Sequence, residues 1–267
     1  MDTCRCCGAE VIREDPAGSV CPACLLRLAV ETGGADAPLS ESETPRLLGP
    51  IGRGPHGTVH LGYRAHDEPR FVTIKLIEER IDVDRFSERI RAVADRLRSA
   101  TPAAIPVFLE PGVTAGGQAY VLSAFVTGAP VAHYGAFRRG DPDAALRTAI
   151  QVCTLVANLH RAGIVHGSIK SSNVIVSDSR EGPVAVLLDT GVGPAIEAAR
   201  IGRDDELIPD VRRDVLGLEM LVIELLDRAG VQGSGLLEGG CASAADLAER
   251  LATLRASRIT YPGEALT

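Results

Sequence analysis

The chain has 267 residues, of which 45% are hydrophobic and 24% are charged, and its formal net charge is −7. These proportions are typical of globular proteins and exclude a wholly disordered chain. The negative balance argues against nucleic acid as a partner, because neutralising phosphates requires clustered Lys and Arg. The start of the chain lacks a signal-peptide pattern, and the most apolar stretch, residues 215–226, is too short for a bilayer. We therefore expect no membrane span and a cytoplasmic location.

Cysteines are concentrated at the start of the chain, where two C-x2-C pairs occur, Cys4 with Cys7 and Cys21 with Cys24. Four thiolates from two such pairs can occupy the corners of a tetrahedron, which is the arrangement that structural Zn²⁺ prefers. We predict a zinc-ribbon-like module at residues 1–30 that binds structural Zn²⁺ through these four side chains. A redox C-x-x-C pair and a site that has lost its metal are the alternatives.

A glycine-rich stretch follows, with the pattern G-x-G-x-x-G-x-V formed by Gly52, Gly54, Gly57 and Val59. Glycines let backbone N–H groups approach phosphates. A dinucleotide-binding turn would open a helix after its glycines, whereas residues 58–63 are β-branched and aromatic and predict a strand. The glycines are therefore predicted to form a hairpin.

A second predicted strand, residues 71–77, carries Lys75 within an apolar run. Beside the glycine hairpin this lysine is placed to bind nucleotide phosphates, and an edge-strand charge kept in water is the alternative. The glycine pattern and this strand resemble the N-lobe of a protein kinase. The apolar spacing of residues 82–99 predicts an amphipathic helix where the family has helix C. Residues 120–126 resemble the fifth strand and hinge, which implies nucleotide contacts from Ala124 and Val126.

The next blocks of the chain resemble the catalytic centre of the same family. Residues 164–176 are similar to its catalytic loop H-R-D-L-K-x-x-N, and residues 186–191 to the strand that carries D-F-G. The resemblance implies that Lys170 contacts the γ-phosphate and that Asn173 and Asp189 bind Mg²⁺, a cation that prefers oxygen ligands. It implies ATP and Mg²⁺ as cofactors. Helices are expected at residues 147–160, from residue 213 onward and at residues 242–257.

Several positions depart from the family's pattern. Ser168 stands where the family has its catalytic Asp, and it cannot act as a carboxylate base. Gly167 replaces the preceding Arg. Arg89 occupies the helix C position of the Glu that pairs with Lys75, and Glu88 takes that role only after a shift of register.

Two substitutions and a short segment add to these departures. Thr190 replaces the Phe of D-F-G, and Thr73 replaces the small Ala that packs on adenine. The segment from Asp189 to Asp214 is short, and its polar part, residues 197–206, is expected to be mobile. That segment builds the peptide-substrate platform in the family.

Isolated His, Cys and Asp residues receive structural interpretations. His160 is expected to be a packing or surface group, and Cys153 and Cys241 small structural residues. His166 is expected to organise the backbone of the catalytic loop, as the family's His does. Asp214 is expected to cap the helix that begins near residue 213 and to brace the catalytic loop.

The expected fold class is α+β, with a bilobal protein-kinase-like fold. A small β-rich N-lobe with helix C and a mostly helical C-lobe follow the zinc ribbon. The expected bounds are 1–30 for the zinc ribbon, 31–45 for a linker, 46–257 for the kinase-like domain (N-lobe about 46–126, C-lobe about 127–257) and 258–267 for a tail.

The leading functional hypothesis is a pseudokinase, a regulatory or scaffolding module in signalling that binds ATP, Mg²⁺ and protein partners. The first alternative is an active but atypical serine/threonine kinase or another ATP-dependent transferase. The second is a zinc-ribbon interaction protein whose kinase-like body binds no nucleotide.

Overall fold

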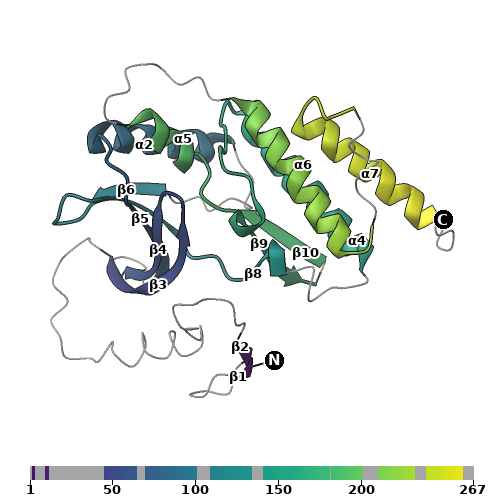
Figure 1. Ribbon diagram of the computed structural model, residues 1–267, viewed down its shortest axis with the longest axis horizontal. Helices are drawn as coiled ribbons and strands as arrows, with labels where there is room; N and C mark the ends of the chain where they lie inside the picture. The colour runs from purple at the N-terminus through teal and green to yellow at the C-terminus, as the bar shows by residue number, and fades with distance from the viewer. Residues whose placement is uncertain are drawn as a thin grey trace. The chain divides into compact units, whose positions relative to one another are not determined.

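The computed structural model divides the chain into two compact units, Met1–Glu78 and Glu79–Thr267 (Figure 1). It describes residues 2–3, 10–11, 45–64, 70–100, 109–133, 141–180, 182–200, 210–231 and 239–260. Within these ranges no helix is long and apolar enough to cross a membrane. The division separates the predicted glycine hairpin from the predicted helix C, and the expected domain bounds remain a prediction.

The described residues nearest the N-terminus form two short strands, β1 (Asp2–Thr3) and β2 (Glu10–Val11), which pair antiparallel. The predicted zinc ligands, Cys4, Cys7, Cys21 and Cys24, lie outside the described residues. The zinc ribbon therefore stays a prediction.

Three antiparallel strands follow in the first unit, in the spatial order β3, β4, β5. Gly57 begins the second strand of the predicted hairpin with a φ of 138°, and a Cβ there would lie 1.9 Å from the carbonyl oxygen of Leu76. Only glycine fits this position. The glycines thus form a hairpin followed by a strand, and the dinucleotide-binding turn is excluded. The strands are β3 (Arg46–Gly54), β4 (Gly57–Arg64) and β5 (Arg70–Ile77).

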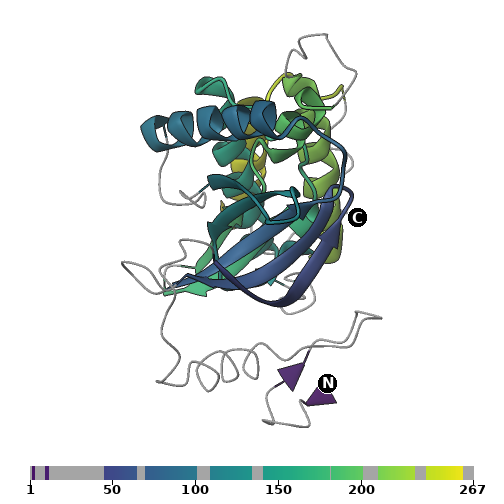
Figure 2. The same cartoon turned by 90° about the vertical axis from the view of Figure 1, so that its left-hand side faces the viewer.

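The second unit begins with α2 (Val83–Ala100), which confirms the predicted amphipathic helix (Figure 2). Asp82 accepts a hydrogen bond from the backbone N–H of Arg85 at 3.0 Å, so it caps the helix. The apolar face buries Phe86 and Ile90 completely. The helix packs against β6 (Leu109–Val113) and α5 (Val192–Ala198). β6 forms an antiparallel hairpin with β7 (Ala119–Ala124).

The longest of the described helices is α4 (Pro142–Arg161), around which α6, α7 and β10 pack. It starts five residues before the predicted helix at 147–160. Asp141 caps it by accepting from the N–H of Ala144 at 2.9 Å, and Pro142 occupies the first turn, where its missing N–H costs nothing. These two residues were the start signal that the apolar pattern alone did not reveal.

The remaining elements complete the second unit, and a small sheet has the order β10, β9, β8. The helix predicted at 242–257 is confirmed as α7, and the helix predicted from residue 213 begins slightly earlier as α6. The bounds are β8 (Ala129–Pro130), η1 (Ser171–Asn173), β9 (Val174–Ser179), β10 (Gly182–Leu187), α6 (Val211–Arg228) and α7 (Ala244–Thr260).

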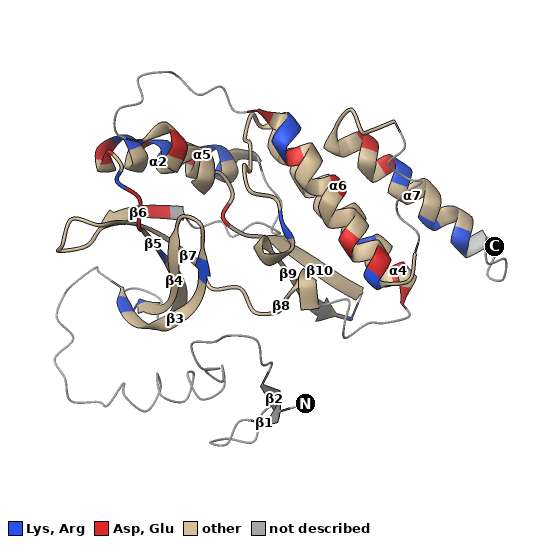
Figure 3. Ribbon diagram, in the orientation of Figure 1, with Lys and Arg blue, Asp and Glu red and all other residues tan. Residues whose placement is uncertain are grey.

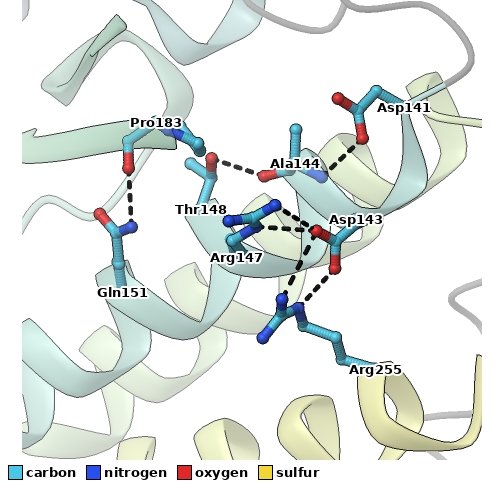
Figure 4. Close-up of polar contacts among 8 residues, drawn as sticks. All are labelled: Asp141, Asp143, Ala144, Arg147, Thr148, Gln151, Pro183 and Arg255. Atoms are coloured by element: carbon cyan, nitrogen blue, oxygen red, sulfur yellow. Dashed lines mark hydrogen bonds and ion pairs between the residues drawn. The ribbon is translucent and has the colours of Figure 1, made fainter. Parts of the chain in front are cut away.

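Polar side chains of α4 join it to its neighbours (Figure 4). Asp143 binds Arg255 of α7, with 2.5 Å between Oδ1 and Nε, and Arg147 of its own helix, with 2.6 Å between Oδ2 and Nη2. The hydrogen bond from Arg255 is the main cause that lowers the pKa of Asp143. Gln151 donates to the carbonyl oxygen of Pro183 at 2.8 Å. These contacts fix both α7 and β10 on α4, the helix that precedes the candidate site.

Candidate functional site

The pairing of β3, β4 and β5, called here the first sheet, aligns three predicted nucleotide-binding residues in one row across the strands. Val59 of β4 pairs with Gly52 of β3 on one side and with Lys75 of β5 on the other. Directly opposed residues project on the same face of a sheet, so Val59 and Lys75 share a face. A Cβ added to Gly52 would meet nothing within 4 Å, which leaves that end of the row open. Thr73, two residues before Lys75, lies on the same face.

The tip of the glycine hairpin is held by Glu78, directly after β5. Its Oε1 accepts from Thr58 Oγ1 at 2.7 Å, and its Oε2 accepts from Arg53 Nη2 at 3.0 Å. The backbone N–H of Glu78 donates to the carbonyl oxygen of His56 at 3.2 Å. The hydrogen bond from Thr58 is the main cause that lowers the pKa of Glu78. Sequence reasoning missed this residue, although an acidic side chain one position beyond a lysine strand was a usable signal.

His166 organises the predicted catalytic loop, as expected. It is completely buried, and its Nδ1 accepts from the backbone N–H of Ser168 at 3.1 Å. Its Nε2 lies 2.7 Å from the carbonyl oxygen of Leu188. Because Nδ1 accepts, the proton sits on Nε2 and is donated to Leu188. The neutral imidazole thus ties the loop to the chain segment that leads into Asp189.

Asp214 of α6 braces the same loop from the other side. Its carboxylate accepts from the backbone N–H groups of His166 at 2.7 Å and Gly167 at 2.8 Å, and from His160 Nε2 at 3.0 Å. Burial by itself raises the pKa of this group, but the hydrogen bonds from His160 and the two amides outweigh it and the pKa is lowered. The predicted bracing role is confirmed.

One expectation about this cluster was wrong. The cap of α6 is Asp210, whose side chain accepts from the N–H of Arg212 at 2.9 Å, because Asp214 lies inside the first turns and faces inward. His160, expected to be a packing or surface group, is largely buried and also donates to the buried carboxylate of Asp214. A carboxylate that has lost its water needs such donors, and this partnership spans 54 positions of sequence.

Asn173 and Asp189, the predicted Mg²⁺ ligands, come from adjoining segments. Asn173 Nδ2 donates to the carbonyl oxygen of Ser168 at 2.8 Å, which leaves Oδ1 as the atom that can bind a cation. The N–H of Leu188 donates to the carbonyl oxygen of Asn173 at 2.8 Å. Asp189 is the one described non-glycine residue with a positive φ, 59°, a conformation that concentrates at functional sites.

This donor pair fits Mg²⁺ held together with nucleotide phosphates. Mg²⁺ in such sites takes one or two protein oxygens and completes its shell with phosphate and water. Among the described residues no group of three or more His, Cys, Asp and Glu side chains is arranged to hold a metal ion. The residues therefore suit a cation that arrives with its own oxygen ligands.

Gly167, at the position predicted to correspond to the kinase Arg, is confined sterically. Its φ is 79°, and a Cβ there would lie 2.4 Å from Cδ of Pro194 in α5. A larger side chain therefore cannot enter while α5 stays in place. Gly191 is similarly confined, because a Cβ there would lie 2.9 Å from Cγ1 of Val93 in α2.

The segment after Asp189 is ordered where a mobile segment was predicted to begin. Glu197 belongs to α5 and forms an ion pair with Arg213 at 3.3 Å. Ala199 is buried, and its carbonyl oxygen accepts from the N–H of Asp82 at 2.8 Å. Arg200 forms an ion pair with Glu79 at 2.7 Å. The expectation of mobility is thus wrong for residues 197–200, because tertiary contacts hold their backbone, and residues 201–206 lie outside the described ranges.

The other predicted site residues have mixed surroundings. Thr190 is buried, and its Oγ1 has no hydrogen-bond partner among the described residues. Ala124 ends β7 and Val126 follows it, and both are half-buried. Glu88 and Arg89 are exposed on α2. They belong to the second unit and Lys75 to the first, so the expected lack of an ion pair between Arg89 and Lys75, and its replacement by Glu88 after a register shift, stay predictions.

A surface pocket of about 370 Å³ lies elsewhere in the second unit. It is lined by Asp95, Arg96 and Ser99 of α2 and by Ala162, directly after α4. None of the predicted site residues lines it.

The chain is similar in sequence to several known protein kinases. No family model matches the chain. The chain is 30% identical over 155 residues to the serine/threonine-protein kinase pkn2 of Myxococcus xanthus, covering 57% of this chain and 18% of that protein. It is 26% identical over 257 residues to Pkn1 of the same organism, covering 84% and 36%. It is 29% identical over 201 residues to PkaB of Streptomyces coelicolor, covering 66% and 46%.

These relatives are serine/threonine kinases from bacteria, and the chain spans less than half of the length of each. The similarity supports a protein-kinase-like domain in this chain. The mixed α+β architecture, with a β-sheet followed by helices, is consistent with a kinase-like fold.

Proposed function

We propose that this chain is a catalytically impaired kinase-like protein that binds ATP with Mg²⁺ and acts as a regulatory or scaffolding module for protein partners. The observation that carries the proposal is Ser168 in an otherwise fully braced loop. His166, Asn173 and Asp214 hold the backbone of this loop through hydrogen bonds. The side chain presented at its centre is a hydroxyl, which cannot serve as a carboxylate base.

Nucleotide binding is supported by the donor groups and the open space around them. Lys75 and Val59 share one face of the first sheet, and Gly52 leaves the end of their row open. Asn173 Oδ1 and the carboxylate of Asp189 would hold Mg²⁺, which when bound neutralises phosphate charge. Within this proposal Lys75 contacts the phosphates and Val59 the base.

Impaired transfer is supported by three features that act together. Phosphoryl transfer depends on positioning and charge stabilisation, so the replacement of the catalytic carboxylate by Ser168 alone would leave some rate. Arg89 brings a second cation, not a carboxylate, to the helix position expected to pair with Lys75. The close contact of Pro194 with Gly167 excludes the family's Arg, which would receive an activating phosphate.

The test is a thermal-shift and calorimetric titration of the full chain with ATP and Mg²⁺. The wild type should show a rise in melting temperature that saturates with ATP, because a ligand that binds the folded state stabilises it. Lys75→Ala should weaken ATP binding about 10- to 100-fold, the usual contribution of a charge-assisted hydrogen bond. Arg91→Ala, an exposed arginine on α2, is the control and should bind as wild type does.

A phosphate-transfer assay separates impaired from active protein. Labelled ATP should leave no label on the chain or on generic protein substrates. Label that appears with wild type and disappears with Lys75→Ala and Asp189→Asn would replace the proposal by an active transferase. Four polar residues favour that second candidate, since together they would supply the phosphate and Mg²⁺ contacts of a working kinase: Lys75, Lys170, Asn173 and Asp189. Absence of any ATP-dependent shift would instead favour an interaction protein that binds no nucleotide.

A further inference from the structure

The solvent-facing side of α6 carries a stripe of five residues, Arg212, Leu216, Met220, Ile223 and Asp227. Their spacing places all five within an arc of about 80° at 3.6 residues per turn. Met220 is 73% exposed and Leu216 60% exposed, the two largest values among the exposed large apolar side chains that the structure describes. Ile223 is half-buried, and Arg212 and Asp227 are exposed. Three consecutive apolar positions of the stripe thus lie between two charged ones.

The opposite side of α6 is fully used by the fold. Leu218, Leu221 and Leu225 are buried there. Gly217 approaches the catalytic loop so closely that a Cβ would lie 2.8 Å from Cβ of Ile169, and Asp214 binds the same loop. The exposed leucine and methionine therefore contribute nothing to this packing. Their exposure needs a separate explanation, because large apolar side chains in one stripe mark interaction surfaces.

The charges on the stripe indicate which partner fits it. Arg212 lies in the first turn of α6 and Asp227 in the last. Figure 3 colours the basic residues of this helix blue and its acidic residues red. Among the described residues neither side chain forms an ion pair. The midpoint between residues 212 and 227 falls between residues 219 and 220, and so does the midpoint between residues 216 and 223. The stripe is therefore complementary to itself when the helix is reversed.

We propose that this stripe binds a second copy of the chain through antiparallel packing of α6 on α6, around a two-fold axis beside Met220. In this arrangement Arg212 faces Asp227 of the partner subunit, and Leu216 faces Ile223 of the partner subunit. A parallel arrangement would place like charges together and is disfavoured. A two-fold axis satisfies both charge pairs at once, as an isologous interface requires.

The dimer should be weak and should depend on concentration. One helix pair buries less surface than the about 1,200 Å² at the lower limit of stable interfaces. Sedimentation and light scattering of the full chain between about 1 and 200 µM, a range that brackets micromolar affinity, should show the mass rising from one copy to two. Met220→Glu should weaken the association about 30-fold or more, because Met220 lies at the centre of the interface.

Charge reversal gives a sharper test. Arg212→Asp and Asp227→Arg should each dissociate the dimer, because each variant sets like charges against each other. Mixing the two variants should restore a dimer, since both pairs across the axis are again opposite in charge. Both substitutions suit the helix dipole, which favours acids in the first turn and bases in the last, so the folded state is retained.

The control is Val211→Glu, which adds the same charge to an exposed apolar residue of α6 that lies outside the stripe. It should leave the association unchanged. A wild type that stays monomeric to the highest concentration would overturn the proposal and would indicate that the stripe binds a different partner. A dimer that persists in Met220→Glu, or variants that fail to recombine on mixing, would overturn it equally.

Discussion

A single buried carboxylate, Asp214, joins three parts of the chain at the residue scale. It accepts from His160 of α4 and from two backbone N–H groups of the catalytic loop, while it belongs to α6. A buried carboxylate is costly unless such donors surround it, and with them it positions the loop. The loop geometry therefore depends on a residue that is not among the predicted nucleotide and Mg²⁺ ligands.

Replacing Asp214 by Asn should destabilise the protein by about 3 kcal/mol at neutral pH, since an uncharged amide cannot satisfy three donors equally well. The carboxyl pKa is lower in the folded protein than its ordinary value of 3.8. The stabilisation is therefore complete above pH 3.8 and is lost as the pH falls through the lower folded value.

Urea unfolding of wild type and Asp214→Asn across this pH range measures the effect. The difference in free energy of unfolding should be constant at higher pH and shrink in acid. Glu249→Gln, an exposed carboxylate on α7, is the control and should show little change. A difference that is independent of pH down to full protonation would show that the charge of Asp214 has no part in stability.

At the scale of elements, α5 is packed directly on the catalytic loop. Pro194 fills the space beside Gly167, and Val93 of α2 fills the space beside Gly191. Both glycines also have a positive φ. Each position therefore needs glycine twice, for its backbone conformation and for the close contact with its neighbour. The order of the segment after Asp189 follows from these contacts and not from its own sequence.

Gly167→Ala should cost about 2–4 kcal/mol, which combines backbone strain with the steric conflict against Pro194. Gly230→Ala is the matched control, because its φ of 73° is similar and a Cβ added there would meet nothing within 4 Å. It should cost about 1 kcal/mol, the strain alone. Denaturant unfolding of both variants separates the two contributions, and equal costs would show that α5 exerts no steric constraint on the loop.

At the scale of the whole molecule, the predicted zinc ribbon can be tested by the zinc content of the purified protein. Purified full-length chain should contain about one Zn²⁺ per molecule, held by four thiolates. Cys4→Ser or Cys21→Ser should each lose the metal, because three thiolates and a hydroxyl bind Zn²⁺ far more weakly. Elemental analysis of the purified proteins provides the measurement.

Cys241→Ser serves as the control for this measurement, since Cys241 lies before α7 and is not a predicted ligand. It should keep its zinc. Wild-type protein that contains no zinc and takes up none on addition would contradict the ribbon and favour a site that has lost its metal.

The sequence by itself determined the order of the elements and the chemistry available at the site. The glycine pattern predicts the β3–β4 hairpin, the strand with Lys75 is β5, and apolar spacing predicts α2, because these signals depend on neighbours within a few residues. The residue types at positions 168, 173 and 189 are likewise readable directly. Their side-chain chemistry alone leads to the expectations about phosphate transfer, namely that a hydroxyl cannot act as a carboxylate base and that amide and carboxylate oxygens can bind Mg²⁺.

Only the tertiary structure decided how those residues are held. Asp214 meets His166 across 48 positions, and only the family resemblance, not a local pattern, implied that Asp214 braces the loop. Asp82 meets Ala199 across more than a hundred positions, a contact that neither the resemblance nor a local pattern predicts. The same reason explains why neither α5 nor the exposed stripe of α6 was predicted from the sequence. A helix's pattern predicts that one face is buried, but the partners of each face are chosen by distant segments that compete for the same apolar surface.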